Sequence, residues 1–208
     1  MAHPAHATPS IETSLAHFRT IPWIANPHLS DPTFHVVTTN ASRTLVQPGN
    51  GHTLTGETWN TEKTITHLIT TYRPGPPSPS GLPPPTTTTE EADADAGQAE
   101  LRRFYTFGTG LNAHPNLLHG GVIATILDSA MGNAIWQAIQ PRPKGPTFTV
   151  NLNITYKKPV STPGSVMVRA TVVRVEGRKI WVSGRVEGEG GVVHASAEGM
   201  WLSAKSKI

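Results

Sequence analysis

The chain has 208 residues, 37% of them hydrophobic, which is enough for one core, and its formal net charge is +3 with ten histidines. It contains no cysteine, so disulfides, thiolate metal sites and a cysteine nucleophile are excluded. The charge is too modest to indicate nucleic-acid binding, and no apolar run approaches the ~18 residues that a membrane span needs.

Residues 1–57 are predicted to form an N-terminal extension that is partly irregular. A short helix is expected over residues 11–20, with Leu15 and Phe18 facing inward, and a short strand near residues 34–37. The first residues have neither the basic start nor the apolar core of a secretory signal. We therefore expect a cytoplasmic protein and leave a mitochondrial location open.

Residues 58–208 are predicted to form the main domain. Ile65, Leu68, Ile69 and Tyr72 lie at helical spacing, which predicts a helix over residues 58–73 that ends before Pro74. Residues 74–99 are rich in proline, then threonine, then acidic residues and alanine. Because such a segment buries almost nothing, we interpret it as an insertion in a surface loop.

A strand is expected over residues 100–110, followed by a turn-rich passage and then by the stretch of residues 116–136, in which a helix begins at Gly120 and Gly121. Apolar residues recur around most of this helix, which predicts that it is buried on more than one side. Asp128 is its only acid. A carboxylate on a buried helix is costly unless it is paired or used, so Asp128 is either a structural acid or part of an active site.

The remaining chain is predicted to be strands over residues 148–156, 166–176, 179–187 and 192–202. In the first of these, Phe148 to Tyr156 alternate with a polar face that includes Thr149. One buried helix followed by an antiparallel meander is typical of an α+β fold in which the sheet wraps the helix.

The start of this helix and Asp128 together could form a catalytic site. Gly121 and Asp128 are separated by about two turns, so they lie on one side of the helix, roughly 10 Å apart. Near Gly120 and Gly121 the first N–H groups have no partner within the helix, which favours binding of a carbonyl oxygen or oxyanion. Asp128 can activate a water or attack directly, whereas no serine elbow is present.

His119-Gly120-Gly121 with Asp128 nine residues after the histidine resembles the HGG…D motif of hotdog-fold acyl-CoA thioesterases, including the PaaI-like proteins. The stretches at residues 149–159 and 175–179 resemble the corresponding parts of the THEM-type (thioesterase superfamily member) enzymes. The resemblance covers about residues 100–204. The N-terminal extension and the insertion resemble those of fungal members.

The resemblance implies a long central helix wrapped by an antiparallel sheet, in a homodimer or a dimer of dimers with active sites at the subunit interface. The substrate would be an acyl-CoA or an acyl-carrier thioester. Asp128 would be the catalytic acid, and the amide of Gly121, with Gly120, would polarise the carbonyl. His119 would orient the loop or touch the thioester, and Thr149 would approach the acid from the partner protomer. Asn112 and Asn116 both compete for the asparagine that many relatives have before the HGG.

Lys157, Lys158, Arg178 and Lys179 are candidates to meet the phosphates of coenzyme A, although charges at hairpin ends are usually only solvated. The histidines form no metal pattern, so neither a metal nor another cofactor is expected. Met131, Ile135, Trp136 and Phe148 are candidates to line an acyl pocket.

Two other functions remain as alternatives. A hotdog hydratase or dehydratase carries an aspartate five residues before a histidine, whereas position 114 is His. A non-catalytic acyl-CoA-binding protein would not need the acid at position 128. We therefore expect a thioester hydrolase.

Overall fold

The computed structural model describes residues 9–38, 43–46, 51–76, 98–142 and 145–204. Its α-helices are α1 (Ile11–Arg19), α2 (Pro22–Ile24) and α3 (Gly120–Ala138). Its strands are β1 (His35–Val36), β2 (Ile65–Arg73), β3 (Glu100–Phe107), β4 (Asn112–His114), β5 (Leu117–Leu118), β6 (Thr147–Tyr156), β7 (Gly164–Glu176), β8 (Lys179–Glu187) and β9 (Val193–Ser203). Short π-helical or 3-10 turns are η1 (Ala25–Leu29), η3 (Leu54–Thr58) and η4 (Glu189–Gly191).

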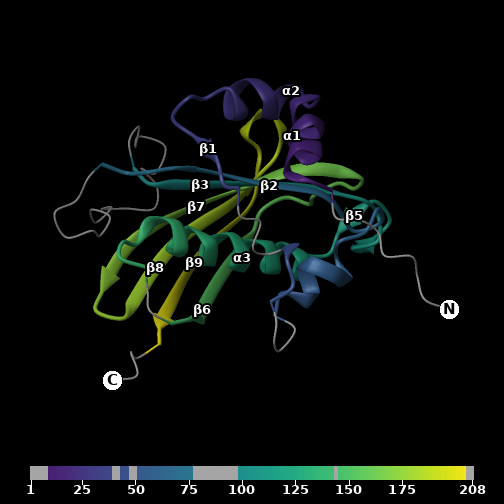
Figure 1. Cartoon of the computed structure of the whole chain (residues 1–208). Coiled ribbons are helices and arrows are strands. Elements are labelled where there is room, and N and C mark those ends of the chain that lie inside the picture. The colour runs from purple at the N-terminus through teal and green to yellow at the C-terminus, as the bar shows by residue number, and fades with distance from the viewer. Residues whose placement is uncertain (1–8, 39–42, 47–50, 77–97, 143–144, 205–208) are drawn as a thin grey trace.

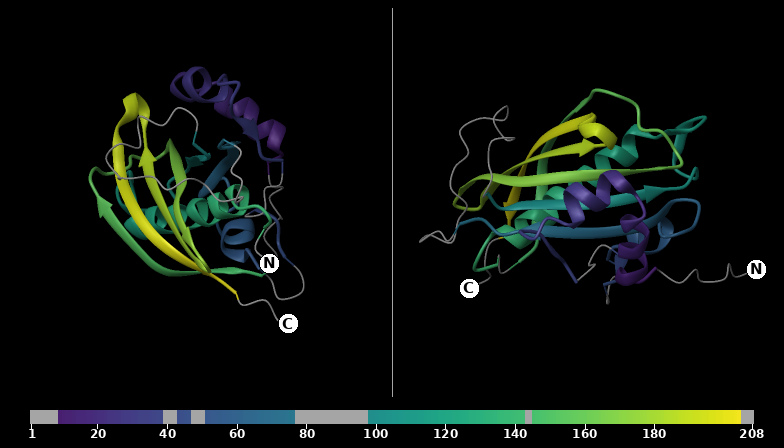
Figure 2. Two further views of the ribbon diagram at one scale, coloured as in Figure 1. Left: turned by 90° about the vertical axis from the view of Figure 1, so that its left-hand side faces the viewer. Right: turned by 90° about the horizontal axis from the view of Figure 1, so that it is seen from above.

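An antiparallel sheet in the order β1-β2-β3-β7-β8-β9-β6 curves around α3 (Figures 1 and 2). Strands β4 and β5 form a separate hairpin directly before α3. A single long helix lying against the inner face of an antiparallel sheet is the hotdog arrangement. The predicted α+β fold with a wrapped central helix is thereby confirmed.

One side of α3 packs on the sheet, and the other side is only partly covered by the described residues. The side chains buried on the sheet side are those of Val122, Ile123, Ile126, Leu127, Ala130, Met131, Ala134 and Ile135. They join inward-facing residues of the strands, such as Tyr105, Val168 and Val182, in one apolar core. Met131 and Ile135 lie in this core and are fully buried, so they do not line an acyl site on the open side.

The helix predicted over residues 58–73 is wrong, because Ile65–Arg73 form strand β2. Strand β2 lies between β1 and β3, and both of its faces are covered. Leu68 packs in the core with α3, whereas Ile69 packs on the opposite face with Phe18. When both faces of a strand are apolar the two-residue alternation disappears, and the remaining apolar spacing imitates a helix.

The N-terminal segment α1-α2-η1 packs on the outer face of the sheet, opposite α3 (Figure 2). A second apolar cluster holds it there, formed by Phe18, Ile24, Ile69, Phe104 and Met167. Ser10 caps α1, because its hydroxyl accepts a hydrogen bond from the Thr13 amide at 3.1 Å. The predicted helix over residues 11–20 is confirmed.

Neutral histidines lie in this contact. His17 of α1 stacks on His67 of β2 with ring centroids 3.8 Å apart, and its Nε2 is 2.8 Å from the Thr106 hydroxyl. Burial lowers the pKa of His17, and burial, His17 and Arg43 lower the pKa of His67. In η1, burial and then Arg102 and Arg169 lower the pKa of His28 to about 4 against the opposing effect of Glu187 and Glu100.

We expect the free energy of unfolding to fall as the pH decreases from about 6.5 toward about 4. The pKa of each of these histidines is lower in the folded chain than in the unfolded chain, so the unfolded state binds protons first. Thermal unfolding measured at several pH values checks this. The variant His28→Gln should reduce the slope, and an equal slope in both proteins would contradict the assignment to His28.

Strand β6 contains a β-bulge that sets which side chains face the helix. Thr149 pairs with Trp201 and Asn151 pairs with Met200, which leaves Val150 as the extra residue. Without the bulge Thr149 would lie on the face opposite Leu152 and Tyr156, as the alternation predicted. With it, Thr149 and Tyr156 both contact α3.

No described helix is both long and apolar enough to span a membrane. Most of the predicted insertion at residues 74–99 lies outside the described residues, because residues 77–97 are not described.

Candidate active site on the open side of helix α3

Asp128 lies on the partly exposed side of α3 and is held by a side chain of β6. The Thr149 hydroxyl donates a hydrogen bond to Asp128 Oδ1 at 2.7 Å. The bond lies within one chain, whereas the family resemblance implied that Thr149 comes from the partner protomer. A hydroxyl that donates to one carboxylate oxygen fixes the orientation of the group and leaves the other oxygen to accept a proton.

His119 is the N-cap of α3. Its ring takes the place of the usual serine or aspartate, because Nδ1 accepts a hydrogen bond from the Gly121 amide at 2.8 Å. A neutral ring that accepts at Nδ1 carries its proton at Nε2, so His119 presents a donor to the surroundings. The side chain is exposed.

This cap changes the assignment of the oxyanion donor. The Gly121 amide, which was expected to bind the carbonyl, is already engaged by His119. The amides of Val122 and Ile123 both donate to the His119 carbonyl, at 2.9 and 3.3 Å. The Gly120 amide forms no hydrogen bond to another described residue, which makes it the available donor at the positive end of the helix.

The two candidate asparagines both lie in the hairpin region before α3, but their contacts differ. Asn116 has a φ of 57° directly after Pro115, the pattern of a type II turn, and its carbonyl accepts from the Thr162 amide at 2.9 Å. Asn116 therefore shapes the turn. Asn112 accepts from the Thr162 hydroxyl at 2.6 Å through Oδ1, so its Nδ2 group points elsewhere and is able to donate.

The four candidate basic residues do not gather in one place within the chain. Lys157 and Lys158 follow Tyr156, and their amides donate to the His194 carbonyl at 2.8 and 3.1 Å. Arg178 lies at the β7–β8 turn, where its guanidinium donates to the Ser203 carbonyl at 2.9 Å. Since β6 and β9 are antiparallel, the two lysines and Arg178 lie at opposite ends of the sheet.

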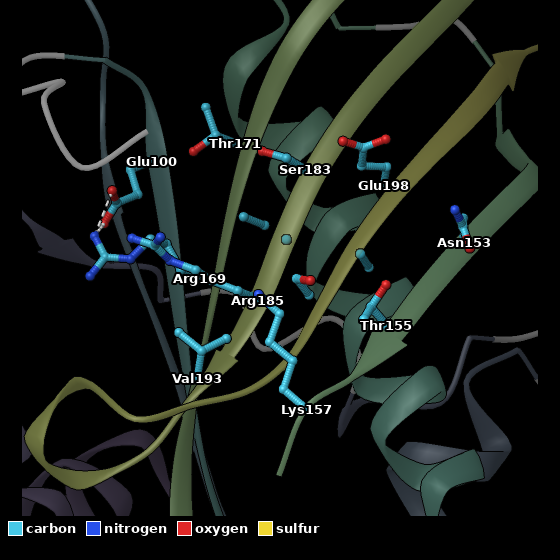
Figure 3. A pocket seen from close by; sticks show the side chains of 14 residues that line it. Glu100, Asn153, Thr155, Lys157, Arg169, Thr171, Ser183, Arg185, Val193 and Glu198 are labelled. Atoms are coloured by element: carbon cyan, nitrogen blue, oxygen red, sulfur yellow. Dashed lines mark hydrogen bonds and ion pairs between the residues drawn. The ribbon is translucent and has the colours of Figure 1, made fainter. Parts of the chain in front are cut away.

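A hollow of about 400 Å³ lies on the outer face of the sheet, away from Asp128 (Figure 3). Its lining includes Lys157, Arg169, Arg185 and Glu198, and neither Asp128 nor Thr149 takes part. A cluster of ion pairs forms one wall. We do not place the active site in this hollow, because the acid, its hydroxyl partner and the helix terminus all lie on the other face of the sheet.

Glu100 is the centre of that ion cluster. Its carboxylate accepts hydrogen bonds from Arg102 Nε at 2.6 Å and from Arg169 at 2.8 and 2.9 Å, with Arg73 at 3.7 Å. Burial alone would raise the pKa of Glu100, but Arg169 and Arg102 outweigh burial and hold it below its ordinary value. The cluster is a structural feature that joins β2, β3 and β7.

In the described part of the chain, no three His, Asp or Glu side chains come together as metal ligands would.

Tyr156 is the contact that the sequence analysis missed. It lies in the stretch of residues 149–159 that resembles the THEM-type enzymes, and its hydroxyl donates to the Gly120 carbonyl at 3.0 Å. Tyr156 was part of the stretch that resembles the family, but strict alternation along the strand predicts Thr149 and Tyr156 on opposite faces. Only the bulge at Val150 brings both to α3.

Replacing Thr149 by valine, which keeps the shape and removes the hydroxyl, should lower the turnover of the proposed reaction about tenfold, because a hydrogen bond to a charged group is lost. Thr149→Ser, which keeps the donor, should retain most of the turnover. Steady-state kinetics of both variants check this. Equal rates for valine and wild type would mean that the 2.7 Å contact with Asp128 has no part in turnover.

Comparison with known proteins gives a consistent result. Residues 115–195 match the family model described as thioesterase superfamily. Mouse acyl-coenzyme A thioesterase THEM4 is 41% identical over 88 residues, which are 41% of this chain and 36% of that protein. An uncharacterized mitochondrial protein of Candida albicans is 31% identical over 93 residues, or 45% of this chain and 40% of that protein. The crystal structure of a Bacillus halodurans protein with CoA is 30% identical, covers 50% of this chain and 66% of that one, and has a TM-score of 0.44.

The matches cover well under half the length of these curated relatives. The residues matched by the family model include α3, the HGG motif and strand β6, which holds the acid. Residues 115–195 of this chain are therefore similar to the thioesterase superfamily.

Proposed function

We propose that the protein hydrolyses the thioester of an acyl-CoA or of an acyl group on a carrier protein. The observation that carries the proposal is the Thr149–Asp128 hydrogen bond of 2.7 Å on the partly exposed side of α3. The name of the mouse relative, an acyl-coenzyme A thioesterase, supports the same substrate class.

The chemistry needs one base and one oxyanion donor. Asp128 takes a proton from water as the water oxygen bonds to the carbonyl carbon, and the Gly120 amide stabilises the negative charge on the carbonyl oxygen. The C–S bond then breaks. The leaving thiolate needs little assistance, because a thiol has a pKa of about 8.5.

These two groups cannot act on one carbonyl within a single chain. Gly120 and Asp128 are eight residues apart on α3, about 12 Å along the axis, whereas both must lie about 3 Å from the reacting group. A second subunit has to bring its own helix terminus to the acid. We propose a homodimer with two such shared sites.

The β6 edge of the sheet is the proposed dimer contact. Strand β6 is the last in the strand order, and it carries the exposed apolar side chains of Phe148, Val150 and Tyr156. Edge strands with unpaired backbone groups pair readily with another strand, and exposed apolar side chains favour burial in such a contact. Two copies of β6 in antiparallel pairing would continue the sheet across the dimer.

The contacts of β6 suggest a register for this pairing. If the two-fold axis passes beside Asn153, so that this residue stands opposite Asn153 of the partner subunit, the extra residue Val150 places Thr149 opposite Tyr156 of the partner subunit. Since Thr149 holds Asp128 and Tyr156 contacts Gly120, this register brings Asp128 toward Gly120 of the partner subunit. It also brings Arg178 and Lys179 toward Lys157 of the partner subunit, which would gather positive charge for the phosphates of CoA.

The test is a thiol-release assay across acetyl, medium-chain, long-chain and aromatic CoA thioesters, with an acyl-carrier substrate beside them. We expect release of free thiol from at least one class and no change in enoyl absorbance with a crotonyl thioester. Tight acyl-CoA binding without thiol release would instead indicate a binding protein. Exposed Trp136 is the remaining candidate for acyl contacts on the open side of α3, because Phe148 lies on the other face of β6 from Thr149.

Two further measurements accompany the assay. Light scattering should give the mass of a dimer of the 22.3 kDa chain, and an active monomer would contradict the shared site. Fusion to a fluorescent protein should decide the compartment between the cytoplasm and the mitochondrion, the latter being the label of the Candida relative.

A further inference from the structure

One peptide group at the start of α3 is held at both of its ends by side chains. This is the peptide between Gly120 and Gly121. Its carbonyl oxygen accepts from the Tyr156 hydroxyl at 3.0 Å, and its N–H group donates to His119 Nδ1 at 2.8 Å. The two contacts come from different elements, because Tyr156 ends β6 and His119 caps the helix.

The chain needs such restraint here. Two consecutive glycines have far more accessible backbone conformations than other residue pairs, so the direction of the Gly120 amide is not fixed by local sterics. The Tyr156 ring also lies against this residue, since a Cβ added to Gly120 would come within 3.5 Å of its Cε1 atom. The ring and the hydroxyl together restrict the peptide that directly follows the available amide.

We propose that Tyr156 is a positioning residue for the oxyanion site, which holds the Gly120–Gly121 peptide so that the Gly120 amide points at the thioester oxygen. The inference rests on the proposed thioesterase function. Tyr156 takes no part in proton transfer, because its hydroxyl is committed to the Gly120 carbonyl. Strand β6 would thus hold both halves of the chemistry, with Thr149 on the acid and Tyr156 on the amide.

The test compares Tyr156→Phe with Thr155→Val, a neighbouring change whose side chain lies on the outer face of the same strand. Phenylalanine keeps the ring and loses only the hydroxyl. We expect kcat to fall about tenfold with KM nearly unchanged, because the amide contact strengthens only in the transition state. The pH dependence of kcat should keep the limb that belongs to the catalytic base.

A second readout does not depend on activity. Hydrogen exchange of the Gly121 amide, followed by NMR, should become several-fold faster in Tyr156→Phe and stay unchanged in Thr155→Val. A purely structural role would lower the melting temperature without separating kcat from KM.

The outcomes distinguish the two proposals. An inactive wild type would overturn the thioesterase function and the positioning role with it. An active wild type with equal kcat in Tyr156→Phe would overturn only the positioning role, and so would a loss confined to KM or an unchanged Gly121 exchange rate.

Discussion

Replacing Asp128 by asparagine should lower turnover about 10²–10⁴-fold while the protein stays folded. Asparagine has the shape of aspartate and its oxygen can still accept the hydrogen bond from Thr149, so the local structure is retained. It cannot take a proton from water or attack the carbonyl. Because Asp128 is only partly buried on the open side of α3, its loss as a charge should cost little stability.

A matched control for this variant is Glu198→Gln, which makes the same chemical change on the outer face of β9. It should leave turnover within about twofold of wild type, since surface substitutions remote from a site have small effects. The measurement is the rate of thiol release by wild type, Asp128→Asn and Glu198→Gln, with thermal unfolding to check that each protein is folded. Wild-type turnover in Asp128→Asn would remove the acid from the mechanism.

Replacing Glu100 by alanine should lower the free energy of unfolding by about 3–5 kcal/mol. The carboxylate lies between Arg102, Arg169 and Arg73, and its removal leaves buried positive charges facing one another. The ion pairs keep the pKa of Glu100 below its ordinary value against the effect of burial. Its stabilisation is therefore present above pH 4.5 and is lost as the pH falls through the lowered pKa.

The exposed pair of Arg174 and Glu176 provides the control. Their side chains are 49% and 59% exposed, against 8% for Glu100, so solvent screens their attraction. Glu176→Ala should change the free energy of unfolding by less than about 1 kcal/mol. Urea unfolding of both variants at neutral pH gives the comparison, and equal losses would show that burial of the cluster contributes nothing special.

The sequence alone predicted the helices and strands whose pattern of apolar residues depends only on their own segment. The long apolar helix, its single acid and the four strands after it followed from the spacing of apolar residues within each segment. The position of Asp128 relative to the helix start was predictable too, since it depends only on helical geometry.

The predictions that were wrong or incomplete share a physical cause. In each, a contact with a distant part of the chain decides the structure, and the residues of the segment itself do not report that contact. Strand β2 carries apolar residues on both faces because α1 covers the outer one, and no pattern within residues 58–73 reports that cover. The Gly121 amide is engaged by the His119 ring, a cap that helix geometry alone does not predict. The partners of Thr149 and Tyr156 depended on one unpaired residue in the middle of a strand.

That unpaired residue has a consequence for any attempt to rebuild or transplant this segment. Ten residues of β6, from Thr147 to Tyr156, run alongside nine residues of β9, from Ala195 to Ser203. Side chains alternate between the two faces of a strand, so the number of residues between Thr149 and Tyr156 decides whether both hydroxyl groups face α3. The identity of the side chains alone does not decide it. A graft or deletion that restores equal lengths would improve the regularity of the ladder while turning one of those hydroxyls to the far side of the sheet.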